Sequence, residues 1–130
     1  MSRWYMLAAL VAVVIGCAAW NAAPASAHHS FAMFDRTKQV KLEGTVKEFQ
    51  WTNPHSWIEI EVPVASGGSE EWLIEALSPN VLGRHGWNRA ILKPSDKVTV
   101  LINPLRDGNK GGNLISVTLP DGRVLGGGAE

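Results

Sequence analysis

The sequence VKLEGTVKEFQW, residues 40–51, alternates between apolar and polar side chains, but the alternation changes phase in its middle. Apolar side chains stand at even-numbered positions up to Val46 and at odd-numbered positions from Phe49 onward. Alternation with a period of two is typical of a half-buried β-strand, because successive side chains point to opposite faces. The change of face near Lys47-Glu48 therefore predicts a β-bulge that bends the strand, as small barrels require at their corners.

Four more segments alternate in the same way and predict strands: residues 57–62, 71–76, 97–102 and 114–119. Between the second and third of these, Ser78-Pro79 is the signature of a helix start, and Gly86 would end the helix after about two turns. Three strands, a short helix and two strands follow the order of the OB barrel. We predict an all-β fold with small α content: a five-stranded OB-like barrel, closed or partly open, with one short helix between strands 3 and 4.

A generic sandwich or roll of five or six strands is the alternative fold, and a short final pairing is expected around Val124. In the barrel, the apolar side chains of one parity on each strand form the core. We expect these residues to be buried: Val40, Leu42, Val46, Ile58, Ile60, Trp72, Ile74, Val98, Val100, Ile115 and Val117.

The N-terminus has the three parts of a secretion signal. A basic start at Arg3 precedes an uncharged apolar run over residues 4–20, and Ala25-Ser26-Ala27 is the pattern that signal peptidase reads. We therefore expect a signal peptide over residues 1–27, a barrel domain over 28–125 and a disordered tail over 126–130. The alternatives are a retained signal anchor, although the run is short for a membrane span, and cleavage before a lipidated Cys17.

The balance of basic and acidic residues limits the classes of binding partner. The chain carries 12 basic and 12 acidic residues, so no net charge attracts nucleic acid or an anionic membrane surface. We expect no nucleic-acid partner, and no membrane contact after signal cleavage unless Cys17 is lipidated. Cys17 is the only cysteine, so the domain after the signal has neither a disulfide nor a thiolate nucleophile.

Catalytic patterns are mostly missing from the sequence. It contains no G-x-S-x-G motif, and the Gly-rich residues 108–112 do not have the form of a phosphate-binding loop. The adjacent carboxylates at 59 and 61 and at 70 and 71 are interpreted as solvated surface groups. The sequence therefore favours a non-catalytic binding protein over an enzyme.

The histidines suggest a metal site. Cleavage after Ala27 would give a chain that begins His28-His29, and an N-terminal histidine offers both its amine and its ring nitrogen to a metal. Copper accepts such nitrogen ligands in a square plane, and His29 would add a second imidazole and His55 a third. We predict a copper site at His28, His29 and His55; the alternative is an exposed polar end, with His55 orienting a turn.

A second candidate site is a surface for a ligand or partner protein. Trp51 and Trp57 flank the Asn53-Pro54-His55 turn, and Trp57 shares its parity with polar side chains rather than with the core. We predict a ligand or partner surface at Trp51, Asn53, His55 and Trp57. A metal-free interaction module that uses this surface is the alternative to a copper-binding protein, and a copper enzyme is less favoured than either.

Five motifs in order resemble one family along essentially the whole chain after the signal. They are His28-His29-Ser30-Phe31, the WTNPH motif of residues 51–55, Ser78-Pro79-Asn80 with Gly86-Trp87, Leu92-Lys93-Pro94 with Asp96-Lys97-Val98, and Val117–Arg123. The family is the group of small exported bacterial proteins known as domain of unknown function 6152.

The resemblance implies a periplasmic protein that is cleaved before His28, and so a periplasmic partner protein or small ligand. It implies no activity. Two positions depart from the family pattern: Ser95, where the turn more usually carries glycine, and Ala76-Leu77 before the helix start.

Overall fold

The computed structural model describes residues 30–127. The chain divides into two compact units, Met1–Phe31 and Ala32–Glu130, and only Ser30 and Phe31 of the first are described. The predicted signal peptide and the histidines at 28 and 29 therefore lie outside the described residues. A short 3₁₀ helix, η2 (Ser30–Met33), opens the described part.

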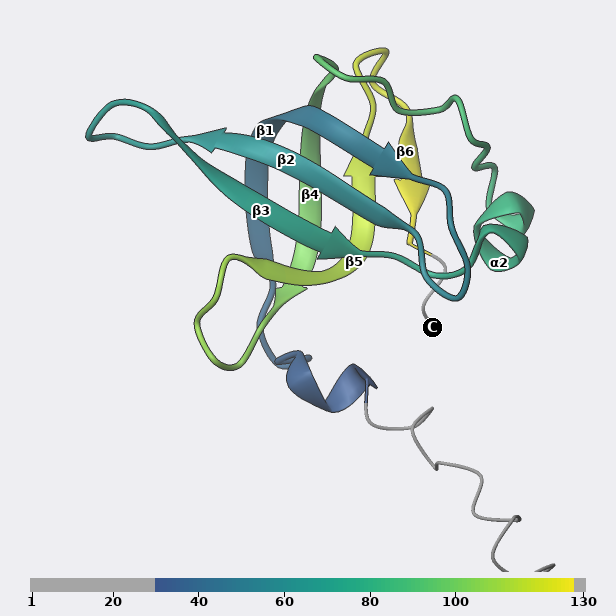
Figure 1. The fold of residues 1–130 in the computed structure, drawn as a ribbon, viewed down its shortest axis with the longest axis horizontal. Helices are drawn as coiled ribbons and strands as arrows, with labels where there is room; N and C mark the ends of the chain where they lie inside the picture. The colour runs from purple at the N-terminus through teal and green to yellow at the C-terminus, as the bar shows by residue number, and fades with distance from the viewer. Residues whose placement is uncertain (1–29, 128–130) are drawn as a thin grey trace, which may run out of the picture. The chain divides into compact units, whose positions relative to one another are not determined.

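The second unit is a barrel of antiparallel strands closed by one parallel pairing (Figure 1). The sheet order is β3-β2-β1-β4-β5-β6, and β3 also pairs with β5. This closes five strands in the OB arrangement, with β6 outside the closed set, and confirms the predicted fold. The elements are β1 (Val40–Gln50), β2 (Trp57–Pro63), β3 (Ser69–Glu75), α2 (Pro79–Arg84), β4 (Lys97–Pro104), β5 (Gly111–Thr118) and β6 (Val124–Gly126).

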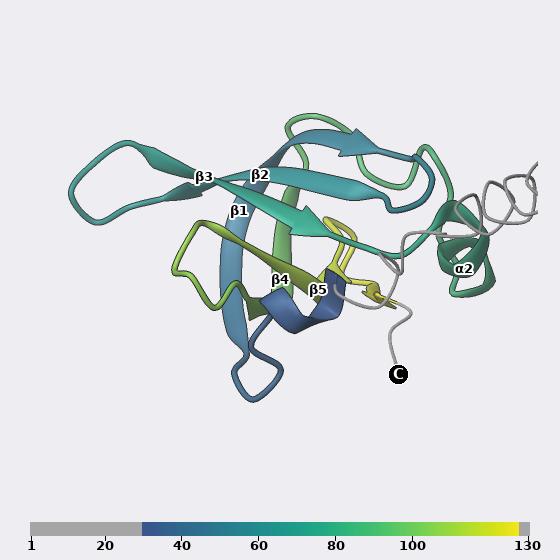
Figure 2. The same ribbon diagram turned by 60° about the horizontal axis from the view of Figure 1, so that its bottom comes forward.

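Strand β1 bends as its sequence predicts. Its first half pairs with β4 and its second half with β2, and the β1–β2 register shifts between Val46 and Glu48. Lys47 is therefore the extra residue of a β-bulge, at the position where the alternation changes phase. In Figures 1 and 2 the β2–β3 hairpin projects from the barrel on the side away from α2.

Most of the predicted core is buried, and three predicted members are only half-buried. Leu42, Val46, Ile58, Ile60, Ile74, Val98, Val100 and Val117 are all buried. Val40 and Trp72 are half-buried at the edge of the core. Ile115 was expected inside but is half-buried: the β4–β5 register skips it, so Leu114 pairs with Ile102 and takes the buried place.

The short helix between β3 and β4 begins and ends as predicted. Ser78 Oγ accepts a hydrogen bond from the backbone N–H of Val81 at 3.4 Å, and Pro79 fills the first turn. Gly86, with a φ of 86°, follows the helix end, where a left-handed residue is favoured. Leu82 is fully buried, so the helix contributes one side chain to the barrel core.

The barrel extends beyond the expected C-terminal boundary at residue 125. Trp87 Nε1 donates a hydrogen bond to the Gly126 carbonyl at 2.8 Å, and the Gly127 N–H donates to the Ile115 carbonyl at 2.8 Å. Gly126 and Gly127, the first two residues of the expected tail, thus belong to the fold. Their pairing uses backbone groups alone, so no side-chain pattern in the sequence indicates it. Residues 128–130 lie outside the described residues.

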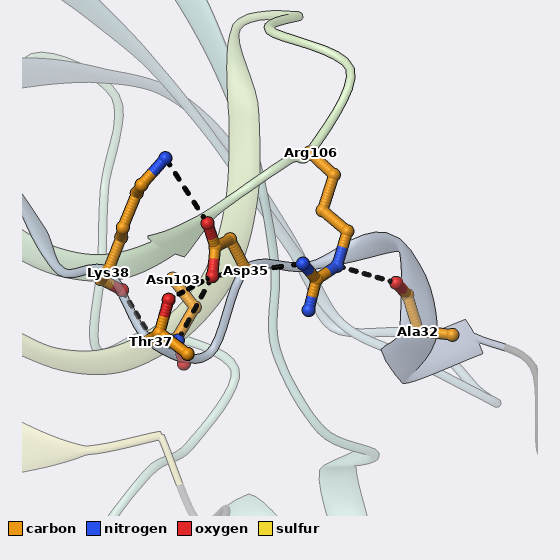
Figure 3. A network of polar contacts seen from close by, with 6 residues as sticks. All are labelled: Ala32, Asp35, Thr37, Lys38, Asn103 and Arg106. Atoms are coloured by element: carbon orange, nitrogen blue, oxygen red, sulfur yellow. Dashed lines mark hydrogen bonds and ion pairs between the residues drawn. The ribbon is translucent and has the colours of Figure 1, made fainter.

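A polar network fixes the segment after η2 to the start of the β4–β5 loop (Figure 3). The Asp35 carboxylate accepts hydrogen bonds from the backbone N–H and the hydroxyl of Thr37, at 3.1 and 2.6 Å, and pairs with Lys38 at 3.3 Å. These hydrogen bonds, those from Thr37 above all, lower the pKa of Asp35. Arg106 Nε donates to the Ala32 carbonyl of η2 at 3.1 Å, and Asn103 Nδ2 of β4 donates to the Lys38 carbonyl at 2.8 Å, so the segment is held on both sides of Asp35.

Candidate functional site

The predicted surface lies on the loop between β1 and β2, at the end of the barrel that carries α2 (Figure 2). The Thr52 hydroxyl donates a hydrogen bond to the His55 carbonyl at 2.9 Å and closes this loop. Asn53 is exposed, whereas His55 and Trp57 are half-buried. The loop therefore presents an amide, an imidazole and an indole close together in sequence.

The two tryptophans of the predicted surface have different surroundings. The Trp51 ring lies edge-on to Phe49 at a centroid distance of 5.8 Å, and Phe49 contacts the buried Trp87 at 5.8 Å. Trp51 is thus packed against the core. Trp57 lies on the outward face of β2, directly opposite Glu75 of β3. Of the two, Trp57 is the one that shares its surroundings with His55.

His55 meets Glu75 because the β2–β3 pairing continues past the end of β2. Ser56 exchanges backbone hydrogen bonds with Ala76 and Leu77, at 2.9 and 3.1 Å. His55 and Glu75 are therefore diagonal neighbours on one face, close enough for their side chains to touch. His55 Nδ1 lies 2.5 Å from Glu75 Oε1.

The carboxylate of this pair is buried and the imidazole is not. The Glu75 side chain is 7% exposed and the His55 side chain 29%. Burial raises the pKa of Glu75, and the positive charge that His55 can carry opposes this rise. The buried Asn113 of β5 donates its amide to the Glu75 carbonyl at 3.4 Å. With Nδ1 engaged, Nε2 is the ring nitrogen of His55 that remains for another partner.

Histidines that bind a metal usually have their second ring nitrogen bonded to a carboxylate, and His55 Nδ1 has such a partner in Glu75. Within residues 30–127, however, no three His, Cys, Asp or Glu side chains gather to hold a metal ion. His55 is thus a single imidazole donor of the barrel. The other two predicted ligands, His28 and His29, lie outside the described residues.

Three of the remaining acidic side chains of β2 and β3, those at 59, 70 and 71, form ion pairs with lysines. Lys47 Nζ lies 2.8 Å from Glu59 Oε1 and also contacts Glu71, and both carboxylates raise the pKa of Lys47, Glu59 the more. Lys110 pairs with Glu70 at 3.1 Å. The side chains of Glu70 and Glu71 are exposed, as the interpretation of solvated groups requires, whereas the side chain of Glu59 is partly buried.

An open groove of about 750 Å³ lies elsewhere on the barrel, lined by parts of β1, β4 and the end of β5. None of the predicted site residues lines it. The groove mixes hydroxyl, charged and apolar side chains, and nothing in it selects a class of ligand.

Sequence reasoning missed Glu75 and Asn113. Glu75 has the same outward parity on β3 as Glu71, and the alternation that predicts the strand treats the two alike. Only the continued pairing at Ser56 and the parallel pairing with β5 distinguish them. The only signal in the sequence was that Glu75, an acidic residue, lies next to a buried apolar residue at the end of its strand.

Comparison with known proteins gives a family and no activity. No curated protein matches the chain, and no solved structure does. Among the described residues, no helix is long and apolar enough to cross a membrane. A family model matches residues 16–114, which is most of the chain. The chain therefore belongs to the family of unknown function DUF6152.

Proposed function

We propose that the protein is a non-catalytic binding module of the periplasm, and that it takes its ligand at the loop between β1 and β2. One observation carries this proposal: the half-exposed imidazole of His55 is held by a buried carboxylate, Glu75, beside the half-exposed Trp57. OB barrels bind ligands on the face of strands 2 and 3 and on the loop between strands 1 and 2. His55 and Trp57 lie on that loop and face.

The ligand that we propose is a copper ion. The amine and ring of an N-terminal His28, with the ring of His29, supply nitrogen donors of the kind that copper prefers. The amine has a pKa of about 8 and imidazole one of about 6.5, so these donors lose their protons near neutral pH. His55 is the imidazole that the barrel itself offers.

The test is a Cu(II) titration of exported protein whose intact mass shows a chain starting at His28. His28→Ala and His29→Ala should each weaken binding. His55→Ala reports the contribution of the barrel, and His85→Ala, at the exposed end of α2, is the matched control. Copper affinity no higher than that of the double variant lacking both His28 and His29 would contradict the copper proposal. So would a lipid-modified chain starting at Cys17.

A second candidate is a metal-free interaction module that docks a periplasmic protein on Trp51, Asn53, His55 and Trp57. Trp57 favours it, because this large side chain is half-exposed outside the core. A photo-crosslinking residue at position 57 should then form a discrete adduct in cells. The same residue at Val124, which is 64% exposed on β6, should not. Equal adducts at both positions would exclude specific docking.

A further inference from the structure

We propose that the protein associates with itself head to tail, so that its partner is a second copy of the same chain. The outward face of β2 and β3 in one copy docks on α2 and the turn after α2 in the next copy. The inference goes beyond the proposed function and does not depend on which ligand that site takes.

Charges of opposite sign are segregated along this part of the chain. Residues 56–75, which include β2 and β3, contain five glutamates and no lysine, arginine or histidine. Residues 76–95, which include α2 and the connection to β4, contain two arginines, one lysine and one histidine, and no aspartate or glutamate. The β2–β3 hairpin projects on the side away from α2 (Figures 1 and 2). The hairpin end of the acidic block and the helix of the basic block therefore lie on different sides of the barrel.

The acidic face surrounds an exposed apolar residue. Leu73 is 46% exposed and pairs with Glu59 of β2. Glu71 lies two residues before Leu73 on the same face of β3, and its side chain is 58% exposed. Lys47 neutralises part of the charge by pairing with Glu59 and Glu71. Glu61 is exposed directly opposite Glu71, and among the described residues no cation pairs with it, so the face keeps a net negative charge.

The surface on α2 has the complementary pattern. Arg84 and Arg89 are exposed, and within residues 30–127 no carboxylate pairs with either of them. Val81 is half-buried one helical turn before Arg84, so the two side chains lie on one face of the helix. The helix thus presents an apolar side chain beside a cation. Strand β3 presents an apolar side chain beside an anion, at Leu73 and Glu71.

Two different surfaces on each copy give a heterologous contact. Every pair that forms leaves one acidic face and one basic surface free, so the association continues into open chains or closes into a ring. The attraction acts between exposed charges and is therefore screened by salt, since the Debye length falls from about 30 Å at 0.01 M to about 8 Å at 0.15 M. Association should be strongest at low salt.

The first test is sedimentation velocity of the exported, purified protein at rising concentration, with a chelator present so that no metal bridges two copies. At about 0.01 M salt the sedimentation coefficient should rise with concentration, and added salt should reverse the rise. Arg84→Glu should abolish it. Lys41→Glu makes the same change of charge on β1, at a side chain 64% exposed, and should not. An unmodified protein that stays monomeric at every concentration would overturn the inference, and so would equal behaviour of the two variants.

The second test uses Glu71→Lys, which removes the acidic surface, together with Arg84→Glu, which removes the basic one. Each protein alone should be monomeric, with the melting temperature of the unmodified monomer. In an equal mixture, the acidic face of the Arg84→Glu copy can dock on α2 of the Glu71→Lys copy, and neither partner can extend the chain. We expect a dimer of one copy of each, which two misfolded variants could not form. A mixture that stays monomeric, or association of either variant alone, would exclude head-to-tail docking.

Discussion

The backbone carbonyl oxygen of Glu61 occupies the space where residue 44 would carry a side chain: a Cβ on Gly44 would stand 2.7 Å from it. Gly44 pairs with Val98 of β4, and the next residue, Thr45, pairs with both Lys97 of β4 and Glu61 of β2. This is the position at which β1 leaves one neighbour for the other. The barrel corner thus depends on a close approach of two backbones, which only glycine permits.

Gly44→Ala should therefore destabilise the protein by about 1–3 kcal/mol, because the obstructing atom belongs to the backbone and cannot rotate away. Gly83→Ala is the control, since a Cβ there meets nothing within 4 Å and the residue lies within α2. In a helix, alanine is favoured over glycine by roughly 0.5–1 kcal/mol, so this variant should be slightly more stable. Urea unfolding measures both, and equal shifts would contradict the account of the corner.

The core makes a second prediction. Ile60 and Val100 are fully buried on β2 and β4, and truncation to alanine should cost about 1–4 kcal/mol through lost burial and a residual cavity. Val124→Ala, at a site 64% exposed, should change the free energy of unfolding by less than about 0.5 kcal/mol. A cost at Val124 equal to that at Ile60 would mean that the assigned strand faces are wrong.

The features that were predictable from sequence are those with a local signature. The phase change at Lys47 located the bulge of β1, and Ser78-Pro79 with Gly86 located the helix that distinguishes the OB order. Ile115 was misplaced because Leu114 and Ile115 are both apolar, so alternation cannot show which of them the β4–β5 irregularity leaves unpaired. A bulge can be recognised in a sequence only where it shifts the apolar residues from one set of alternating positions in the strand to the other.

The candidate site was predictable only in part. The sequence singles out His55 and Trp57 as candidates, because a tryptophan on the polar face of a strand, close to a histidine, is unusual. Glu75 was not found, since its burial arises from contacts with His55 and β5 that lie far away along the chain. Which of two similar carboxylates becomes buried is a property of the tertiary fold and not of strand β3.

Ser95 makes a third prediction, because it has a φ of 77° without being glycine. A left-handed backbone costs a residue with a Cβ roughly 1–2 kcal/mol, so Ser95→Gly should stabilise the turn by about 1 kcal/mol after the added flexibility of glycine in the unfolded chain. Ser95→Ala keeps the Cβ and should give no such gain. Thermal unfolding distinguishes the two, and an equal gain from alanine would contradict the explanation.

The lowered pKa of Asp35 predicts that the stability of the protein depends on pH. Its pKa in the folded protein is lowered from the usual 3.8, chiefly by the hydrogen bond from the Thr37 hydroxyl. The folded state therefore favours the ionised form, and this stabilisation is present above pH 3.8 and lost as the pH falls through the lower, folded pKa. Asp35→Asn should lower the melting temperature at neutral pH, and the difference from the unmodified protein should vanish in strong acid. Thr37→Val should reproduce part of the effect, and a difference independent of pH would contradict the assignment.

The last prediction separates a chelating N-terminus from an ordinary pair of exposed histidines. If copper binds both the amine and the ring of His28, one additional alanine before His28 moves the amine off the chelating residue. Cu(II) affinity should then fall by a large factor, while the thermal stability of the metal-free protein should stay unchanged because every barrel residue is retained.

Two controls make this comparison decisive. Any exposed pair of histidines binds some copper weakly, so the extended chain gives the baseline for such binding. Because the amine and the ring must both be deprotonated, the affinity of the native chain should fall as the pH drops through the imidazole range, near 6.5, and below. Equal copper affinity in the native and extended chains would mean that the amine is no ligand, and the metal-free docking surface around Trp57 would then be the function to test.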